Sequence, residues 1–566
     1  MHPAHIIAPY LALTPGTRLG PLEVLRRLSG RQTLSLTVQS CVAVAEETSI
    51  ATKPHQERNR FLDGVERLGN ALPDPVLIFV GLIALLMAMS AVGAAADWSA
   101  INPVTGQTLI VKSLLSEQSL RLLFTEIPRT YAAFAPLGLV LTVMLGAGVA
   151  DRSGLFAALV RACLSAVHGR ALVPVVMLTG MLSCHAVDAA YVVFVPLAGV
   201  IFANAGRHPV LGLTVGFAGV CVGLAGNLLP GSYDVLILGI TETGARLIQP
   251  DWTMNPLGNW WFSVGIAVLF TGLGWIVTER IVDPRLGVWH GESSAANEWQ
   301  AAQLTTVERR GLRAAGLAAL GVAALFAALS LWPGFTPLYD EAAAPGQRLT
   351  PLFLGLPLGF MLLFLATGWA YGAVAGTIRS HRDVVAMMAK GLEGMVPYLV
   401  LVFFAAQFVA MFGWSNLGPI TAIVGAERLR AIHAPPALLL PMLTTMSAWL
   451  DFLIASGSAK WTAMAPVGAP MMMLLGISPE MTTAAYRVGD TVTNLISPLN
   501  PYFVLTLMFC RRWVPDFRLG SLLALLLPLS IAFFLGGAAL TAIWVALEIP
   551  VGPGAAVSYT LPTPVR

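Results

Sequence analysis

The stretch 447–502 reads SAWLDFLIASGSAKWTAMAPVGAPMMMLLGISPEMTTAAYRVGDTVTNLISPLNPY, and the rest of the chain is interpreted from it. Its first apolar run breaks at 456–461, and after a second apolar run the polar residues of 487–494 lead into Pro498. The flanking sequence is membrane-like on both sides. Polar, helix-breaking residues at membrane depth are tolerated only where they line a cavity or are buried by protein. We therefore expect this stretch to contribute to a binding site.

The composition indicates a membrane protein. The chain has 566 residues, of which 56% are hydrophobic and only 11% are charged, whereas a soluble domain has roughly 25% charged residues. The apolar segments are long and continuous rather than alternating, which excludes a transmembrane β-barrel. The net charge of +3 points to no acidic partner such as nucleic acid, and the five cysteines show no spacing typical of disulfide or zinc sites.

The pattern predicts an all-α polytopic membrane protein with nine transmembrane helices, two re-entrant hairpins, an inverted repeat and broken helices at the midplane. An apolar run of about 20 residues can cross a bilayer. The hairpins are predicted at about 171–205 and 435–478, because each has two apolar halves too short to cross and a polar tip between them. The predicted crossings are 75–96, 132–150, 210–238, 260–279, 312–331, 352–371, 396–412, 482–507 and 521–547.

Lysines and arginines predict the orientation. They gather in alternate loops, and the positive-inside rule then places the N-terminus in the cytoplasm and the C-terminus outside a bacterial inner membrane. The segments 155–167 and 414–432 are apolar or amphipathic but too short to cross, so we expect interfacial helices there.

Two halves of the chain carry the same parts in the same order. We expect a first transport repeat at 59–280 and a second, inverted repeat at 351–550, joined at 281–350 by a cytoplasmic loop, a span and an external loop. The first hairpin starts from the cytoplasm and the second from outside, and inverted repeats with interrupted segments are typical of secondary transporters. Residues 1–58 are expected to form a disordered cytoplasmic extension or to precede the true start, and 551–566 an external tail.

Acidic and basic residues in the interrupted segments are candidates for transport chemistry. Asp188, at the first hairpin tip, suits a proton carrier or cation ligand, unless that tip is simply solvated. Arg487 and Asp490 lie three residues apart and share a helix face. Arg487 could then bind a carboxylate-bearing substrate while Asp490 relays protons, or the two could belong to a structural ion pair.

The second hairpin adds further candidates. Ser458 could donate a hydrogen bond to substrate and Trp461 could stack on an aromatic ring. The alternative for Lys460 and Trp461 is a snorkelling lysine beside an interfacial tryptophan. Asp451 is an acid inside an otherwise apolar run, and it either titrates with substrate or faces an aqueous cavity.

Side-chain oxygens at the helix breaks are candidate ligands for a bound sodium ion. Asn227, Asn494, Thr491 and Thr493 lie where unwound carbonyls could join them around a hard cation. A sodium site would fall near Ser183, Asn227 or Asn494. Alternatively, these side chains satisfy backbone groups that the breaks leave free.

Enzymatic alternatives have little support in the sequence. It contains no Walker A, HExxH or G-x-S-x-G motif, which argues against ATP-driven transport by this chain and against common hydrolysis. A membrane-embedded enzyme would have to use Ser183 with His185 and Asp188. A channel would give a flux that neither saturates nor concentrates substrate.

These stretches together resemble the AbgT family of p-aminobenzoyl-glutamate transporters. The resemblance covers about 59–554. It rests on HAVDAAYVVFVPL, GRHPVLGL with AGNLL, FGWSNLG, SGSAKW with MAPV, ISPE, AYRVGDTVTNLISPL and PYF. It implies nine spans, two hairpins and a homodimer in which each protomer has its own pathway.

The resemblance also implies a function and a set of pathway residues. Members import p-aminobenzoyl-glutamate or export sulfonamide-like antimetabolites, driven by protons and in some members with a proposed sodium site. The sequence departs from the family at Cys184, which weakens a sodium site, and at Asp451, which stands where members usually have Asn. The implied pathway residues are Asp188, Ser458, Trp461, Pro479, Arg487, Asp490 and Pro498.

We therefore expect a proton-coupled secondary transporter of p-aminobenzoyl-glutamate or related aromatic antimetabolites, including p-aminobenzoate and sulfonamides. No cofactor is expected. The alternative within transport is a sodium-coupled carboxylate carrier.

Overall fold

The computed structural model describes residues 75–561 except 104–105, 165–168, 187–189, 288, 290–303, 344–347, 394, 434, 455 and 498. All described residues belong to one compact unit, Gly64–Arg566. The predictions for residues 1–58, for Asp188 and for Pro498 lie outside the described residues.

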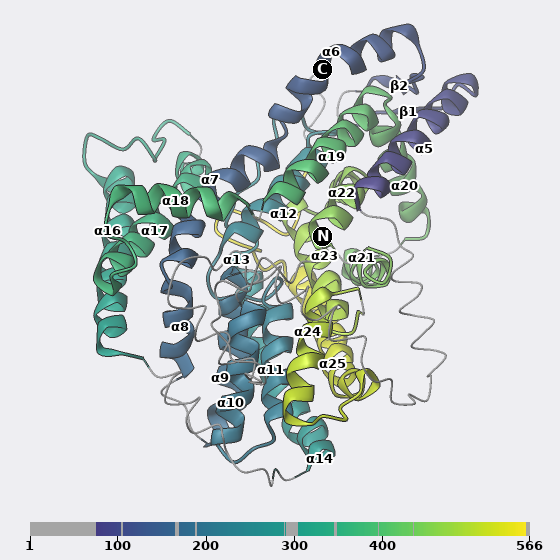
Figure 1. Ribbon diagram of the computed structural model, residues 1–566. Helices are drawn as coiled ribbons and strands as arrows, with labels where there is room; N and C mark the ends of the chain where they lie inside the picture. The colour runs from purple at the N-terminus through teal and green to yellow at the C-terminus, as the bar shows by residue number, and fades with distance from the viewer. Residues whose placement is uncertain are drawn as a thin grey trace, which may run out of the picture. The chain divides into compact units, whose positions relative to one another are not determined.

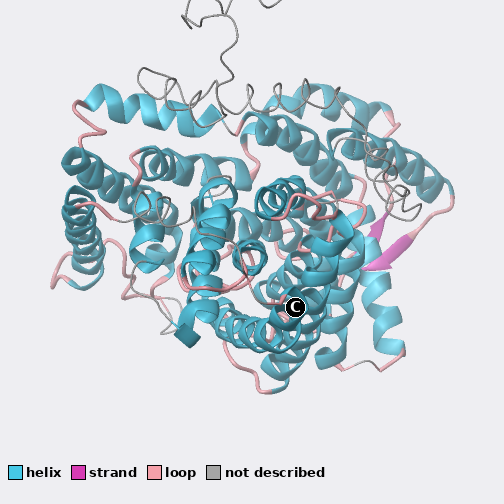
Figure 2. Ribbon diagram, turned by 60° about the horizontal axis from the view of Figure 1, so that its bottom comes forward, coloured by secondary structure: helices cyan, strands magenta, loops and turns pink. Residues whose placement is uncertain are grey.

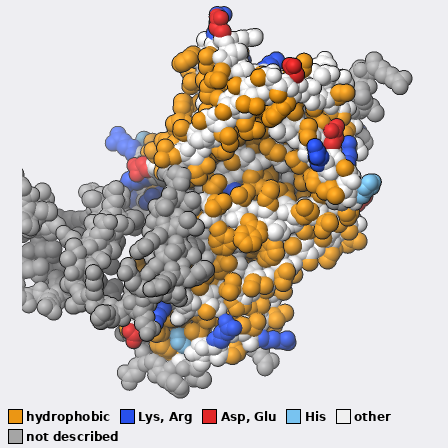
Figure 3. All heavy atoms as spheres, turned by 90° about the vertical axis from the view of Figure 1, so that its right-hand side faces the viewer, with side chains coloured by type: hydrophobic (Ala, Val, Ile, Leu, Met, Phe, Trp, Pro, Cys, Tyr) orange, Lys and Arg blue, Asp and Glu red, His pale blue; other side chains and the backbone are white. Residues whose placement is uncertain are grey.

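In the described part of the chain, seven helices are long and apolar enough to cross a membrane. They coincide with the seven continuous crossings that the sequence predicts. Hydrophobic side chains cover most of the middle of the face in Figure 3, as contact with lipid tails requires. The seven are α5 (Pro75–Ala95), α6 with α7 (Glu117–Ala132 and Ala135–Arg152), α13 (Trp260–Val277, continued by η4 Thr278–Val282 and α14 Asp283–Leu286), α16 (Thr306–Leu331), α17 (Thr350–Ala375), α19 (Val396–Trp414) and α25 (Leu519–Ala546).

The two remaining predicted crossings are interrupted, as expected. The first consists of α11 (Pro209–Val222) and α12 (Ser232–Ala245), separated by a segment that contains Pro230. The second consists of α23 (Pro479–Asn494) and α24 (Pro501–Trp513). Each piece is shorter than the roughly 20 residues that a crossing needs, so the breaks are confirmed while the crossings remain a prediction.

Both predicted hairpin regions contain a pair of helices. The first pair is α9 (Leu172–Ser183, followed by η2, Cys184–Ala186) and α10 (Val195–Asn204, preceded by η3, Ala190–Phe194). The second pair is α21 (Pro436–Leu450) and α22 (Gly457–Leu474). In both halves a hairpin helix packs against the first piece of the broken helix, α9 on α11 and α21 on α23 (Figure 1).

Glycines allow these two contacts. A Cβ on Gly180 of α9 would lie 2.9 Å from the Cα of Gly219 in α11. A Cβ on Gly489 of α23 would lie 2.1 Å from the carbonyl oxygen of Thr444 in α21. The backbones therefore approach as closely as small residues permit, in the way that membrane helices pack. The matching contacts fit the predicted repeat, whose inverted geometry remains a prediction.

The position of the second hairpin tip corrects the sequence prediction. We expected the break at 456–461, but α21 ends at Leu450 and α22 already begins at Gly457. Ser456 caps the new helix, because its side chain accepts a hydrogen bond from the N–H of Ala459. Ser458, Lys460 and Trp461 therefore lie in the first turns of a helix rather than in a loop.

Short helices lie between the spans. The two predicted segments form α8 (Leu155–Leu164) and α20 (Leu417–Ala431). The amphipathic helix α18 (His381–Glu393) was not predicted. In its first turn, Asp383 accepts hydrogen bonds from the backbone N–H groups of Arg379 and Ser380, and these bonds lower the pKa of Asp383.

A two-stranded antiparallel sheet corrects the all-α prediction. Strands β1 (Ser99–Ile101) and β2 (Thr108–Ile110) pair in the polar segment after α5 (Figure 2). Ala100 and Leu109 of the sheet pack against smaller buried clusters. The largest cluster draws on the hairpin helices, the broken helices, α13 and α25.

Candidate functional site

Three charged side chains meet where the second hairpin joins α23. The ammonium nitrogen of Lys460 lies 2.8 Å from a carboxylate oxygen of Asp451 and 2.8 Å from one of Asp490. All three side chains are fully buried. Asp451 directly follows α21, Lys460 is in the first turns of α22 and Asp490 is in α23. We call these three residues the buried charge cluster.

Hydroxyl groups complete the contacts of the two acids. Asp490 accepts hydrogen bonds from Tyr233 at 3.3 Å and Tyr486 at 3.4 Å. Asp451 accepts one from Thr493 at 3.0 Å. The cluster holds two carboxylates for one ammonium group, so one negative charge is left without a balancing cation. Burying such a charge is costly unless a proton or a cation neutralises it.

Arg487 forms a second buried ion pair, with Asp234 at 2.7 Å. Its other nitrogens donate to the carbonyl oxygen of Leu224, at 2.9 and 2.5 Å, beside the break in the first broken helix. Asp234 in turn accepts from the N–H of Gly231 at the start of α12. This ion pair therefore joins the two broken helices.

Of the two alternatives for Arg487 and Asp490, a structural ion pair between them is not what the structure shows. Arg487 and Asp490 share the helix, but Arg487 binds Asp234 and Asp490 binds Lys460. Sequence reasoning missed Asp234 and Tyr233. The sequence pattern that could have revealed them is Ser-Tyr-Asp directly after Pro230 and Gly231, because it places polar groups at the start of a half-helix.

Trp461 is fully buried and stacks on Tyr486, with ring centroids 4.2 Å apart and an interplanar angle of 26°. Its indole N–H donates to Thr241 of α12, which also bonds to Thr483 of α23 at 2.7 Å. The alternative of a snorkelling Lys460 beside an interfacial Trp461 is therefore wrong, since both side chains are enclosed by protein.

The two remaining described pathway residues, Pro479 and Ser458, lie at the starts of helices. Pro479 opens α23 directly after its cap, Ser478. Ser458 lies within 3.5 Å of the Ser456 hydroxyl. Neither residue touches the buried charge cluster through a bond that the structure records among the described residues.

The residues proposed for sodium make contacts that favour the alternative. The amide of Asn227 donates to the carbonyl oxygen of Met181, and its side-chain oxygen accepts from the N–H of Leu229. Asn494 donates to the carbonyl of Asp490. Ser183 donates to the carbonyl of Gly180. Three of the predicted side chains thus satisfy backbone groups near the breaks.

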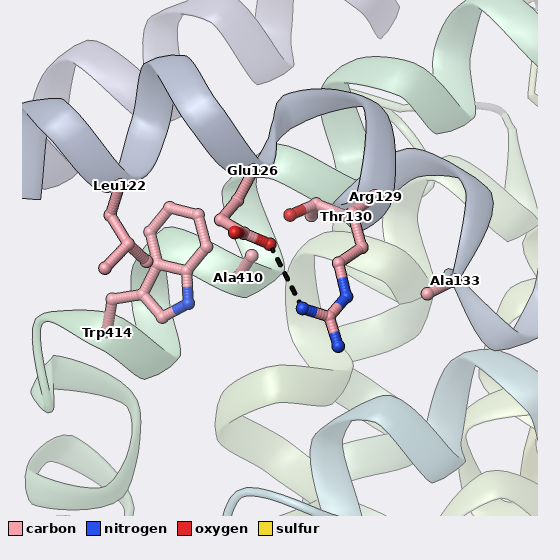
Figure 4. Close-up of a pocket in the computed structure, with 7 residues that line it drawn as sticks. All are labelled: Leu122, Glu126, Arg129, Thr130, Ala133, Ala410 and Trp414. Carbon is pink, nitrogen blue, oxygen red and sulfur yellow. Dashed lines mark ion pairs between the residues drawn. The ribbon is translucent and has the colours of Figure 1, made fainter.

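A groove on the surface lies apart from these residues. It has a volume of about 300 Å³ and is formed by α6 and α19 (Figure 4). Glu126 and Arg129 line it and form a 3.7 Å ion pair, and Trp414 lies on the other side of Glu126 from Arg129. None of its lining residues belongs to the buried charge cluster.

Long apolar helices around two broken helices, with buried charges at the breaks, define a polytopic membrane transporter. The sequence model of the AbgT putative transporter family matches residues 60–559. The chain belongs to this family.

Three relatives support the assignment. The p-aminobenzoyl-glutamate transport protein of Escherichia coli (strain K12) is 35% identical over 509 residues, which are 89% of this chain and 99% of that protein. The structure of the Alcanivorax borkumensis YdaH transporter, described as having an unusual topology, matches with a TM-score of 0.78 and 40% identity, covering 85% of this chain and 100% of that one.

The third relative is Neisseria gonorrhoeae MtrF, whose structure is described as illuminating a class of antimetabolite efflux pumps. It matches with a TM-score of 0.82 and 37% identity, covering 88% of this chain and 100% of that one. These relatives are named as transporters or pumps, which decides against the membrane-embedded enzyme considered from the sequence.

Proposed function

We propose that this protein is a secondary transporter that couples the proton gradient to movement of p-aminobenzoyl-glutamate or related aromatic antimetabolites, such as p-aminobenzoate and sulfonamides. We place it in a bacterial inner membrane with the N-terminus inside, as a homodimer. The relatives named above support the substrate class. The mass of the protein in detergent, measured by light scattering, tests the dimer.

The excess acid of the buried charge cluster carries the proton-coupling part of the proposal. Lys460 can neutralise one of its two acids, Asp451 or Asp490. When the site is closed to water, the second acid is stable only in its protonated form or beside a bound cation. Opening to either side would let that proton exchange with water, so transport and proton movement become linked. Asp188 remains a predicted additional proton carrier.

The neighbouring residues suit the two ends of the proposed substrate. The guanidinium group of Arg487 can bind a glutamate carboxylate through paired hydrogen bonds. Because Arg487 already binds Asp234, the substrate carboxylate has to replace Asp234 as its partner. Trp461 and Tyr486 form an aromatic stack, and the Tyr486 hydroxyl bonds to Asp490 of the buried charge cluster. Such a stack suits an aminobenzoyl ring once it opens.

Proteoliposomes with an imposed pH gradient and no sodium test this proposal. We expect labelled p-aminobenzoyl-glutamate to accumulate with the wild type and to fail to accumulate with Asp490→Asn. Glu126→Gln removes an acid from the surface groove instead and serves as the matched control, which should accumulate substrate normally. Accumulation that requires sodium and ignores the pH gradient would support the sodium-coupled alternative.

A further inference from the structure

A second cavity lies at the other end of α23 from Asp490. It has a volume of about 240 Å³ and forms where four segments meet: the loop after α12, the start of α17, the first turn of α23 and the segment before the C-terminus. The charge distribution of the sequence predicts all four on the outer side of the membrane. The cavity shares no residue with the buried charge cluster.

Glu480 is the charged group of this cavity. Only 5% of the residue is exposed. Among the described residues, the only donor that the structure gives its carboxylate is its own backbone N–H. The other acid of this region, Glu242, is balanced by Arg246 at 2.6 Å and by the N–H of Met254. A buried carboxylate with no donor from another residue is costly, so Glu480 is expected to gain from a ligand that brings N–H donors.

The walls of the cavity specify the rest of the ligand. Trp252 and Phe353 line it, together with polar groups that include Asn255 and Ser478. A cavity of about 150 Å³ holds benzene, so this one accommodates a single substituted ring rather than a whole p-aminobenzoyl-glutamate molecule. The Glu480 carboxylate attracts an amino group and repels a ligand carboxylate.

We propose that this cavity is an outer subsite for neutral aromatic amines, in which Glu480 accepts hydrogen bonds from the amino group and Trp252 and Phe353 enclose the ring. The proposal rests on the transport function proposed above and refines its substrate class. Glu480 lies seven residues before Arg487 in α23, or about 10 Å along the helix axis at 1.5 Å per residue. A ligand in the outer subsite is therefore held close to the central residues, on the same helix.

Calorimetric titration of the purified full-length protein with sulfanilamide, a neutral aromatic amine, tests this subsite. Trp461→Ala removes the central aromatic stack, so binding that persists in that variant is assigned to the outer subsite. Adding Glu480→Gln should then weaken binding about tenfold or more, because a hydrogen bond to a charged acceptor becomes a neutral one. Glu126→Gln in the same background is the matched control and should bind sulfanilamide as before.

A second variant and a second ligand keep the test independent of misfolding. Phe353→Ala, on α17, should also weaken sulfanilamide binding, with thermal unfolding used to verify that each variant is folded. p-Aminobenzoate should bind the subsite more weakly than sulfanilamide because of its carboxylate. Absence of binding in the Trp461→Ala protein, or an affinity unchanged by Glu480→Gln, would overturn the subsite.

The result that would reject the proposed transport function differs from the result that would reject the outer subsite. Proteoliposomes in which p-aminobenzoyl-glutamate never accumulates would reject transport, while sulfanilamide binding that depends on Glu480 would still support the subsite.

Discussion

At the scale of single residues, Lys460 has the largest electrostatic role in the buried charge cluster. It is the ion-pair partner of both Asp451 and Asp490. Lys460→Met should therefore leave two adjacent buried carboxylates without their cation, and removing one partner of a buried pair costs about 3–5 kcal/mol. Asp451→Asn should be tolerated far better, because it leaves a balanced Lys460–Asp490 pair and an amide oxygen that still accepts from Lys460.

Thermal unfolding in detergent, followed for both variants beside the wild type, measures this difference. The expected order of unfolding temperatures is wild type close to Asp451→Asn, with Lys460→Met clearly lowest. Equal losses in the two variants would show that Lys460 does not balance the two acids as described.

The identities of these residues could be read from the sequence, but their partners could not. Lys460, Asp490 and Arg487 stand out because they are charged residues in apolar surroundings. Asp234 is 253 residues from Arg487 in the chain. Hydropathy and local spacing carry no information about which helices that are distant in the sequence contact each other in the fold. That choice depends on how the two broken helices pack together.

At the scale of elements, the start of α22 places its first turn directly against α23. A Cβ on Gly457 would lie 2.6 Å from an Asp490 carboxylate oxygen and 2.8 Å from the Tyr233 hydroxyl. Gly457→Ala should therefore displace these groups and greatly reduce proton-driven uptake, although alanine favours helix formation. Gly468→Ala, in the same helix with no atom within 4 Å of the added methyl, is the matched control.

Uptake into proteoliposomes and thermal unfolding are measured for both the Gly457→Ala and the Gly468→Ala variants. We expect Gly468→Ala to transport normally and to unfold at or slightly above the wild-type temperature, because alanine is about 1 kcal/mol better than glycine in a helix. Normal uptake by Gly457→Ala would contradict the close contact at Asp490.

Elements with a strong local signal were predictable, and the others were not. Long apolar runs gave the seven long helices, and glycine and proline marked the breaks in the two interrupted ones. The tip of the second hairpin was placed too late because Ser456, Gly457 and Ser458 look like a turn, whereas Ser456 caps a helix. The helix α18 and strands β1 and β2 lie in polar connections, where hydropathy gives little guidance.

At the scale of the whole molecule, the orientation prediction accounts for the outer subsite. Four segments that lie far apart in the sequence, and that the distribution of lysine and arginine predicts on the outer side, come together around one cavity. An error of one in the predicted number of crossings between any two of them would put their ends on opposite sides of the membrane. The cavity therefore makes the orientation of every intervening span testable at once.

Labelling of single cysteines in whole cells tests this orientation in the full chain, with its five native cysteines replaced. Ala342 and Arg382 are both exposed and lie at opposite ends of α17. Since α17 is predicted to cross the membrane, Ala342→Cys should react with a membrane-impermeant maleimide in intact cells, and Arg382→Cys should react only after the cells are permeabilised. The reverse pattern would mean that the chain has the opposite orientation in the membrane, with the Glu480 cavity on the cytoplasmic side. Equal reaction of both sites in intact cells would mean that α17 does not separate the two compartments, and the predicted set of crossings would then be wrong.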